Sequence, residues 1–484
     1  MAISLYTSRL VLEYLGIKSF GVYTVVASLS MMFTYFSWSI SSSLTRFLAF
    51  DIANDDLPGL KKCFSSSLLS CVYISGFILV LCETIGIWAL YHVLDIPPER
   101  LHDAFLVFQA TIIVLILDML RTCCQSLIIA YEKMSFFAYV SITESVLKLG
   151  VALLLAFIAN GRLVCYAFLL SGVSAITLLI YIFYCRRYFP KVKFTLRKGR
   201  ERIKEIMQFT GWNALASFAD LCYIQGTSII LNVFYGVAYN ATMGITNQVK
   251  NAVYSFSKNL QTAAFPHMTK EYALKNYASF EKLTTLISNL SFLLLYLIGL
   301  PIIINAECIL NIWLVVVPPQ AAIFMRLVIV FCLIDSLVGP LWTAMQSYGR
   351  LKTYQIIISI GWLLSLPTLW IVYEAGAAPE SLIVIQIIFN VALLVVRIFF
   401  ATRYCHINLS FYLNHVIWKL LVTAVISGFL PIMAGMLDMG DTGRLFLTTG
   451  ITLVTVPLCA FFIALTPEER VKVSAFIKKK IKHE

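Results

Sequence analysis

Apolar segments of about 20 residues or more, separated by short polar connections, follow one another along almost the whole chain. Each is long enough to cross the hydrocarbon core of a bilayer as a helix. We therefore predict an all-α, polytopic membrane protein with about 14 transmembrane helices. The predicted spans lie near residues 1–16, 20–45, 67–92, 104–131, 137–159, 163–185, 206–235, 239–267, 283–304, 320–347, 353–373, 380–402, 410–435 and 444–466.

One long polar segment interrupts this pattern, and it divides the chain into two similar halves. The sequence CRRYFPKVKFTLRKGRERIKE, from Cys185 to Glu205, holds nine Lys or Arg and two Glu. Such a basic connection between apolar segments is typical of a cytoplasmic loop. The predicted organisation is an N-lobe of helices 1–6 (1–185), a basic inter-lobe loop (186–205), a C-lobe of helices 7–12 (206–402), helices 13 and 14 (403–466) and a basic amphipathic tail (467–484).

The second half repeats the first weakly. A shift of 220 residues pairs Gly16 with Gly236 and Asp51 with Glu271, and a shift of 217 pairs Asp118 with Asp335. Both shifts place each span on the span six positions later, which predicts two six-helix bundles related by a pseudo-two-fold axis along the membrane normal, with the substrate site between them. Chance resemblance between apolar sequences is the alternative interpretation.

The first predicted helix is short compared with its partner in the repeat. Only fifteen residues precede Gly16, whereas thirty, from Ile206 to Tyr235, precede Gly236. The repeat therefore predicts that the first helix is truncated at its N-terminal end.

The charges are distributed unevenly between the two sides of the membrane. If the N-terminus is cytoplasmic, the inner connections carry 24 of the 37 basic residues and the outer connections carry four. Because Lys and Arg are retained on the cytoplasmic side, this asymmetry predicts that both termini are cytoplasmic. It also explains the net charge of +12 without a nucleic-acid partner.

The sequence contains no recognisable catalytic or metal-binding motif. Its 12 cysteines show no CxxC spacing, and most lie within apolar segments, where a thiol packs as a small apolar group. We expect no metal site, no cofactor and no catalytic residues, and hence a transporter and not an enzyme. A polysaccharide polymerase or ligase is the enzymatic alternative, but such an enzyme is expected to have a larger outer loop than this chain provides.

Fifteen ionisable residues fall within the predicted spans, where a charge requires a partner or a hydrated cavity. Three helix-spaced pairs, Arg9 with Glu13, Asp118 with Arg121, and Glu144 with Lys148, are consistent with local neutralisation or with function. Bases exceed acids, which favours an anionic cargo. The bases are Arg9, Arg46, Arg121, Lys148, Lys250, Lys258, Arg326, Arg397 and Lys419, and the acids are Glu13, Glu83, Asp118, Glu144, Asp220 and Asp335.

Two spans are unusually polar. Residues 239–267 contain Asn, Gln, Ser and Thr along their whole length, together with Lys250 and Lys258, so this helix is predicted to line an aqueous cavity. The serines between Ser37 and Ser43 predict a similar polar wall in the second span. Arg46, Arg326 and Arg397 lie near span ends, where snorkelling to the surface is the simpler interpretation.

Several segments in order resemble the Wzx-type polysaccharide repeat-unit flippases of the multidrug, oligosaccharidyl-lipid and polysaccharide exporter superfamily. They are LYTSRLVLEYLGIKSFGVYTVVASL, FTGWNALASFAD, ILNVFYGVAYNATMGITNQV and AAFPHMTKEYA, and the resemblance covers most of residues 1–402. It implies two helical bundles around a basic, water-accessible cavity in the bacterial inner (plasma) membrane. The implied activity is movement of an undecaprenyl-diphosphate-linked oligosaccharide to the outer leaflet, for O-antigen, lipopolysaccharide or capsule biosynthesis.

The resemblance also implies roles for individual residues. The substrate-binding bases of the family map onto Arg9, Arg46, Arg121, Lys148, Lys250 and Lys258, although the short first helix departs from the family pattern around Arg9. Asp118, Glu144, Asp220 and Asp335 are candidates for coupling to a proton or sodium gradient. Expected partners are the anionic lipid-linked oligosaccharide, membrane lipids and a polysaccharide polymerase. A multidrug or metabolite exporter and a lipid II flippase of the same superfamily remain the alternatives.

Overall fold

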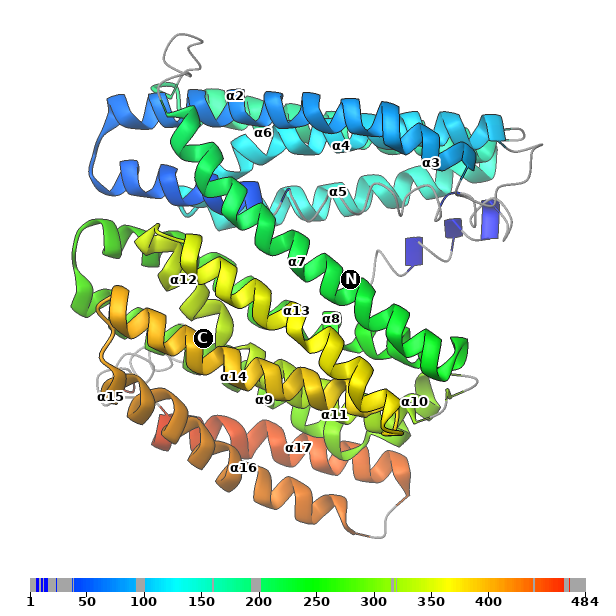
Figure 1. Ribbon diagram of the computed structural model, residues 1–484, viewed down its shortest axis with the longest axis vertical. Coiled ribbons are helices and arrows are strands. Elements are labelled where there is room, and N and C mark those ends of the chain that lie inside the picture. Colours follow the sequence, from blue (N-terminus) through cyan, green and yellow to red (C-terminus); the bar gives the residue numbers. More distant parts are fainter. Residues whose placement is uncertain are drawn as a thin grey trace, which may run out of the picture. The chain divides into compact units, whose positions relative to one another are not determined.

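A computed structural model gives the fold of the chain (Figure 1). Its continuous described segments are residues 39–92, 101–158, 161–192, 202–314, 320–437 and 440–464, with a few isolated positions elsewhere. The chain divides into two compact units, residues 1–221 (unit 1) and residues 222–484 (unit 2). The division falls inside one continuous helix, α7 (Ile203–Tyr235).

Unit 1 is a bundle of long helices in which α4 packs most extensively along α6. Residues 39–53 are helical, and α2 follows after a tight turn in which Asp56 Oδ1 accepts a hydrogen bond of 2.9 Å from the Gly59 backbone N–H. This is an N-cap, and it fixes where α2 begins. The further elements are α2 (Leu57–Leu81), the π-helical turn η1 (Cys82–Gly86), α3 (Ile87–His92), α4 (Leu101–Ala130), α5 (Met134–Leu154), the 3-10 turn η3 (Leu155–Phe157) and α6 (Arg162–Tyr188).

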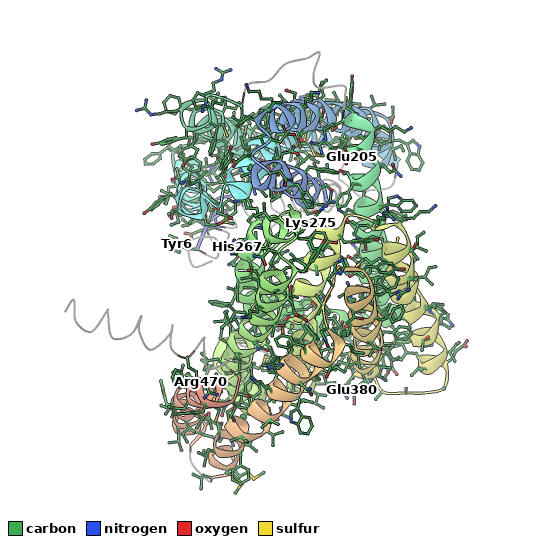
Figure 2. The ribbon with its side chains drawn as sticks, turned by 90° about the vertical axis from the view of Figure 1, so that its left-hand side faces the viewer. Tyr6, Glu205, His267, Lys275, Glu380 and Arg470 are labelled. Atoms are coloured by element: carbon green, nitrogen blue, oxygen red, sulfur yellow. The ribbon has the colours of Figure 1, made fainter. Side chains whose placement is uncertain are left out.

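Unit 2 is a second helical bundle, in which α8 packs along α9 and α16 along α17. Gly236, at φ 78°, separates α7 from α8 in a conformation that favours glycine. Figure 2 labels Lys275, in the turn between α8 and α9, and Glu380, in the turn between α13 and α14. Its elements are α8 (Val237–Ala273), α9 (Tyr277–Ile304), α10 (Ala306–Trp313), α11 (Ala321–Asp335), α12 (Val338–Tyr348), α13 (Lys352–Glu374), α14 (Ser381–Tyr404), α15 (Leu409–Tyr412), η5 (Leu413–Trp418), α16 (Lys419–Gly435), α17 (Asp441–Cys459) and η6 (Ala460–Ala464).

The predicted fold class is confirmed. Eleven helices of the described chain are long and apolar enough to cross a membrane, and no strand occurs among the described residues. Helix α8 has 37 residues but is not among the eleven, in keeping with the polar composition noted in its sequence. Most of the short first helix and residues 471–484 of the predicted amphipathic tail lie outside the described residues, as do residues 193–201 of the inter-lobe loop.

Two elements refine the sequence expectation. The span predicted at residues 320–347 is present, at Ala321–Tyr348, but a turn at Ser336 and Leu337 divides it into α11 and α12. The preceding connection, expected to be a plain outer loop, contains the short helix α10. Gly339 and Pro340 lie in the first turn of α12, and both residue types weaken a continuous helix.

Candidate functional site

In unit 1, four charged side chains of α4 and α5 form one ion network. Arg121 Nη1 lies 2.8 Å from Glu144 Oε2, and Arg121 Nη2 lies 3.4 Å from Asp118 Oδ1. Lys148 Nζ lies 2.7 Å from Glu144 Oε1. Two of the three pairs expected from helical spacing are therefore present, and the Arg121–Glu144 contact joins them across the helix boundary. Two acids and two bases make the network formally neutral.

The network is buried at its centre and accessible at its ends. The side chains of Arg121 and Glu144 are 17% and 22% exposed, whereas those of Asp118 and Lys148 are 37% and 46% exposed. From α6, Ser174 faces Asp118. The Nε atom of Arg121 is buried and has no hydrogen-bond partner among the described residues.

Arg46, also predicted to bind substrate, lies in an aromatic cage on the helix at residues 39–53. Its guanidinium carbon is 4.9 Å from the ring centroids of Phe47, Phe50 and Phe209. Phe209 belongs to α7, so the cage joins two helices of unit 1. Cation–π contacts of this kind stabilise packing, and they add a role to Arg46 that its position in the sequence did not suggest.

Close to this cage, Arg202 holds the start of α7 against the same helix. Arg202 Nη1 lies 3.0 Å and 2.8 Å from the two carboxylate oxygens of Asp51. Burial raises the pKa of Asp51 above its ordinary value, although Arg202 acts in the opposite direction. Burial lowers the pKa of Arg202, but the attraction and hydrogen bond of Asp51, together with Cys63 and Glu205, outweigh it and raise that pKa. Burial of the carboxylate is opposed by Arg202, so loss of the guanidinium would leave Asp51 without its counter-ion.

The serines of the second span make contacts within unit 1. Ser39 Oγ lies 2.6 Å from Ser217 Oγ of α7, and Asn213 Nδ2 of α7 donates a 3.0 Å hydrogen bond to Ser43 Oγ. Ser41 Oγ lies 3.4 Å from Ser126 Oγ of α4. These hydroxyls hold helices together, whereas the sequence suggested a wall exposed to water. Buried hydroxyls require such partners.

In unit 2, Lys250, Tyr254 and Lys258 recur every fourth residue on α8 and so share one side of the helix. Lys250 Nζ lies 4.3 Å from the ring centroid of the buried Phe331 on α11. Tyr254 lies against Asp335 at the end of α11, and Lys258 is exposed. This side of α8 therefore carries two cations and approaches an acid.

Asp335 lies where the span of α11 and α12 is broken. Its Oδ1 is 3.4 Å from Nδ2 of Asn390 on α14. At the break, Gln261 of α8 donates a 3.0 Å hydrogen bond to the backbone carbonyl of Ser336. Broken helices with polar groups at the break are a recurring feature of substrate and ion sites in secondary transporters.

Arg397 of α14 is a residue whose setting the sequence interpretation got wrong. It was expected to snorkel from a helix end, but it is only 6% exposed. Its Nη1 donates a 2.6 Å hydrogen bond to the hydroxyl of Tyr354 on α13. Arg397 follows Asn390 by seven residues, so both lie on one side of α14. That spacing of two polar residues in an apolar helix is the signal that would have indicated burial.

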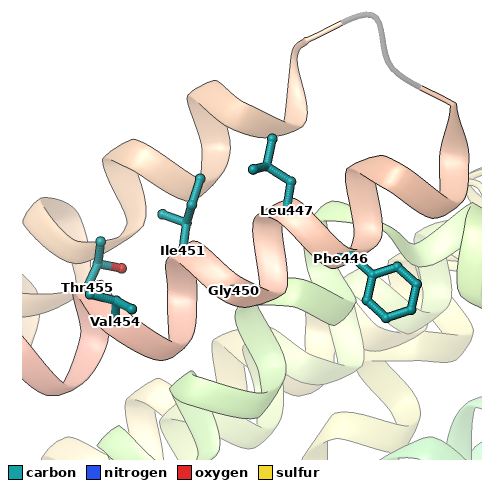
Figure 3. A pocket seen from close by; sticks show the side chains of 6 residues that line it. All are labelled: Phe446, Leu447, Gly450, Ile451, Val454 and Thr455. Atoms are coloured by element: carbon teal, nitrogen blue, oxygen red, sulfur yellow. The ribbon is translucent and has the colours of Figure 1, made fainter.

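The remaining predicted residues lie elsewhere. Asp220 is exposed on α7 and takes no part in the ion pairs described above, and Arg9 lies outside the described residues. In the described part of the chain, no group of three or more His, Cys, Asp or Glu side chains is placed to hold a metal ion. An open apolar groove of about 430 Å³ follows one side of α17, lined by Phe446, Leu447, Gly450, Ile451, Val454 and Thr455 (Figure 3).

Comparison with known families decides the class of protein. A family profile described as "Polysaccharide biosynthesis protein" matches residues 3–271, which is more than half of the chain. The chain belongs to this polysaccharide biosynthesis protein family. No curated protein sequence matches it significantly.

Solved structures show that this family member has the fold of MATE transporters of the MOP superfamily. An outward-facing multidrug resistance MATE family transporter aligns with a TM-score of 0.73 at 12% identity, covering 84% of this chain and 92% of that one. A MATE structure in the bent conformation gives 0.70 at 15% identity, covering 87% and 92%. A MOP superfamily transporter from Pyrococcus furiosus, described as having a binding pocket of reverse polarity that suggests a different function, gives 0.72 at 12% identity, covering 84% and 93%.

Proposed function

We propose that the chain is a flippase that moves a polyprenyl-diphosphate-linked oligosaccharide repeat unit from the inner to the outer leaflet of the bacterial plasma membrane. Membership of the polysaccharide biosynthesis family and a MATE-like transporter fold support this proposal. Both termini would then be cytoplasmic, and a polysaccharide polymerase would use the exported unit. The product would be a surface polysaccharide such as an O-antigen or a capsule.

The observation that carries the proposal is the polar side of α8. Lys250 and Lys258 lie on one side of a helix that contains many Asn, Gln, Ser and Thr residues. A diphosphate needs cationic donors, and an oligosaccharide needs many hydrogen-bond partners, since neither enters hydrocarbon without them. A helix that carries both kinds of group suits this cargo, while the polyprenyl chain remains in lipid.

The decisive experiment is complementation of a deletion strain with the Lys250→Gln/Lys258→Gln variant. Each lost charge-assisted contact to the diphosphate should weaken binding by roughly tenfold or more. We therefore expect surface polysaccharide to fall at least about tenfold, with unflipped lipid-linked units accumulating in the inner leaflet. Lys275→Gln, at the exposed turn after α8, is the matched control and should complement fully. Normal polysaccharide from the double variant, at normal protein levels, would refute the proposal.

The similarity to multidrug transporters supports a second candidate, export of a drug or metabolite. Cationic drugs favour an acidic site, whereas the polar side of α8 carries two lysines. Loss of the chain would then lower resistance to toxic compounds and leave surface polysaccharide unchanged. A lipid II flippase would instead show its defect in cell-wall synthesis.

A further inference from the structure

The α4–α5 ion network has a geometry that a purely structural ion cluster does not need. Arg121 divides its two terminal nitrogens between two carboxylates, and the contact to Asp118 is long, at 3.4 Å. Its Nε is buried without a hydrogen-bond partner among the described residues. An arginine that holds a single carboxylate in a bidentate pair makes two parallel, short hydrogen bonds. Arg121 instead makes one short and one long contact, to two different carboxylates.

The two ends of the network are accessible. Lys148, at 46% exposure, and Asp118, at 37%, lie on either side of the more buried Arg121–Glu144 contact. A phosphate group presents several acceptor oxygens, so it can accept from the guanidinium fork of Arg121 and from the ammonium of Lys148 together. Each of these contacts is at present made by a carboxylate.

We propose that this network is an exchange site, in which a phosphate or diphosphate group displaces the carboxylates of Glu144 and Asp118 from Arg121 and Lys148. The inference rests on the proposed function, because it assigns the phosphate to the lipid-linked cargo, which would meet this network of unit 1 in addition to the lysines of α8. In the unoccupied state the carboxylates act as internal counter-ions for the two bases. This arrangement lets the chain hold two cations within a membrane at low cost until an anionic cargo arrives.

The negative charge that a diphosphate adds gives the exchange a consequence that can be measured. The unoccupied network is neutral, and a bound diphosphate would add at least two negative charges. Each displaced carboxylate loses its cation in a partly buried setting, which favours its protonated form. The proton comes from solvent and forms the O–H bond of the displaced carboxylic acid, so cargo binding is accompanied by proton uptake.

The groups that face the two carboxylates are Arg121 from α4, Lys148 from α5, and Ser174 and Tyr181 from α6, with Cys124 and Cys185 beside Tyr181.

Calorimetry on the full chain in phosphatidylcholine nanodiscs tests the exchange, with geranyl diphosphate as the probe. Titrations in two buffers of different ionisation enthalpy, at a mildly alkaline pH where the probe itself is ionised, give the number of protons taken up. We expect roughly one proton or more per bound diphosphate. Geraniol, which has the same tail and no phosphate, should cause no uptake.

Two variants and one control identify the groups. Glu144→Gln keeps both bases but cannot take up a proton, so binding should persist while proton uptake falls. Arg121→Gln should weaken binding by roughly tenfold or more. Lys133→Gln, at the exposed start of α5, should bind and take up protons as the original chain does. Glu144→Gln is expected to bind the probe, and binding shows that this variant folds. Its proton uptake therefore tests the exchange even if Arg121→Gln does not fold.

The outcomes separate this proposal from the proposed function. Diphosphate binding without proton uptake, or binding unaffected by Arg121→Gln, would overturn the exchange while the complementation experiment still stood. Proton uptake on transfer to phosphatidylglycerol nanodiscs, in the absence of the probe, would overturn the assignment to cargo and indicate a lipid headgroup. Unchanged surface polysaccharide in a strain that lacks the chain would refute the flippase itself.

Discussion

Each unit contains an aspartate inside a membrane helix, and the two units compensate it differently. In unit 1, Asp118 belongs to a neutral network of ions with Arg121, Glu144 and Lys148. In unit 2, Asp335 meets the amide of Asn390, and the buried Arg397 bonds to the hydroxyl of Tyr354. The sequence repeat pairs Asp118 with Asp335, so two positions that correspond in the repeat have different surroundings.

The difference separates a site that can exchange ions from one that is fixed by hydrogen bonds. An ion network can release one charged member if another ion of the same sign replaces it, because the electrostatic energy is largely recovered. A buried ion held by neutral groups has no such substitute and loses its hydrogen bond when the partner is removed. Asp118 and Arg121 of unit 1 are therefore suited to anion exchange, whereas Asp335 and Arg397 of unit 2 are suited to holding fixed charges.

The largest effect is expected from Tyr354→Phe in unit 2, which removes one oxygen atom and keeps the ring. Arg397 is 6% exposed and would lose its 2.6 Å hydrogen bond, so we expect a loss of about 3 kcal/mol in the free energy of unfolding. Thermal or denaturant unfolding in detergent measures this. By contrast, Ser174→Ala in unit 1 should cost less than about 1 kcal/mol, because Asp118 retains Arg121.

A double substitution controls for unspecific loss of packing. Arg397→Met combined with Tyr354→Phe removes the buried charge together with its partner, and it should recover much of the stability. Tyr404→Phe, on the same helix as Arg397 but 41% exposed, should have almost no effect. If Tyr354→Phe proved as mild as Tyr404→Phe, the contrast between the two units would not hold.

A smaller, asymmetric effect is expected at the Asp51–Arg202 pair of unit 1. Arg202→Gln leaves a carboxylate that is only 10% exposed without its cation, which should cost about 2 kcal/mol after allowance for the exposed part of Arg202. Asp51→Asn should cost less than about 1 kcal/mol, because Arg202 keeps Glu205 at 3.3 Å and the desolvation cost of the carboxylate disappears. Unfolding of both variants at neutral pH compares the two values.

The pH dependence of the same variants gives an independent check. Burial already raises the pKa of Asp51, and removing Arg202 should raise that pKa further. A folded state with a raised carboxyl pKa binds protons more tightly than the unfolded state, so its stability increases as the pH falls through that pKa. The deficit of Arg202→Gln should therefore shrink in mild acid. A constant deficit would show that Asp51 is not the group responsible.

Local sequence patterns predicted the fold class and part of the candidate site. Apolar segment lengths gave the helices, and the spacing of Asp118, Arg121, Glu144 and Lys148 gave two ion pairs. The contact between Arg121 and Glu144 links residues 23 positions apart on different helices. Its existence depends on the register in which α4 and α5 pack, which helical spacing within either one does not encode.

Tertiary packing also explains what the sequence interpretation missed. Position near a span end suggested that Arg397 reaches the surface, but neighbouring helices cover it. For Arg46, two of the three caging rings are close in sequence, at Phe47 and Phe50, and the third, Phe209, comes from a distant helix. In both cases the deciding contact comes from a helix that the local pattern does not include.

The smallest effect is expected from substitutions at the break between α11 and α12. They test whether uncharged hydrogen-bonding groups also hold this part of unit 2. Gln261 Nε2 lies 3.0 Å from the Ser336 carbonyl oxygen and 3.2 Å from Ser291 Oγ. Gln261→Ala should cost about 1 kcal/mol, since one buried carbonyl loses its donor. A Cβ on Gly339 would lie 2.0 Å from Gln261 Oε1, so Gly339→Ala should displace the amide and cost a similar amount.

Because both substitutions remove the same contact, their combined cost should be well below the sum of the two. Gly244→Ala, on α8 where an added Cβ meets nothing within 4 Å, is the control and should be neutral or slightly stabilising. Additive costs in the double variant would show that Gln261 does not hold the break. The fixed character of unit 2 would then rest on Arg397 with Tyr354 and on Asp335 with Asn390.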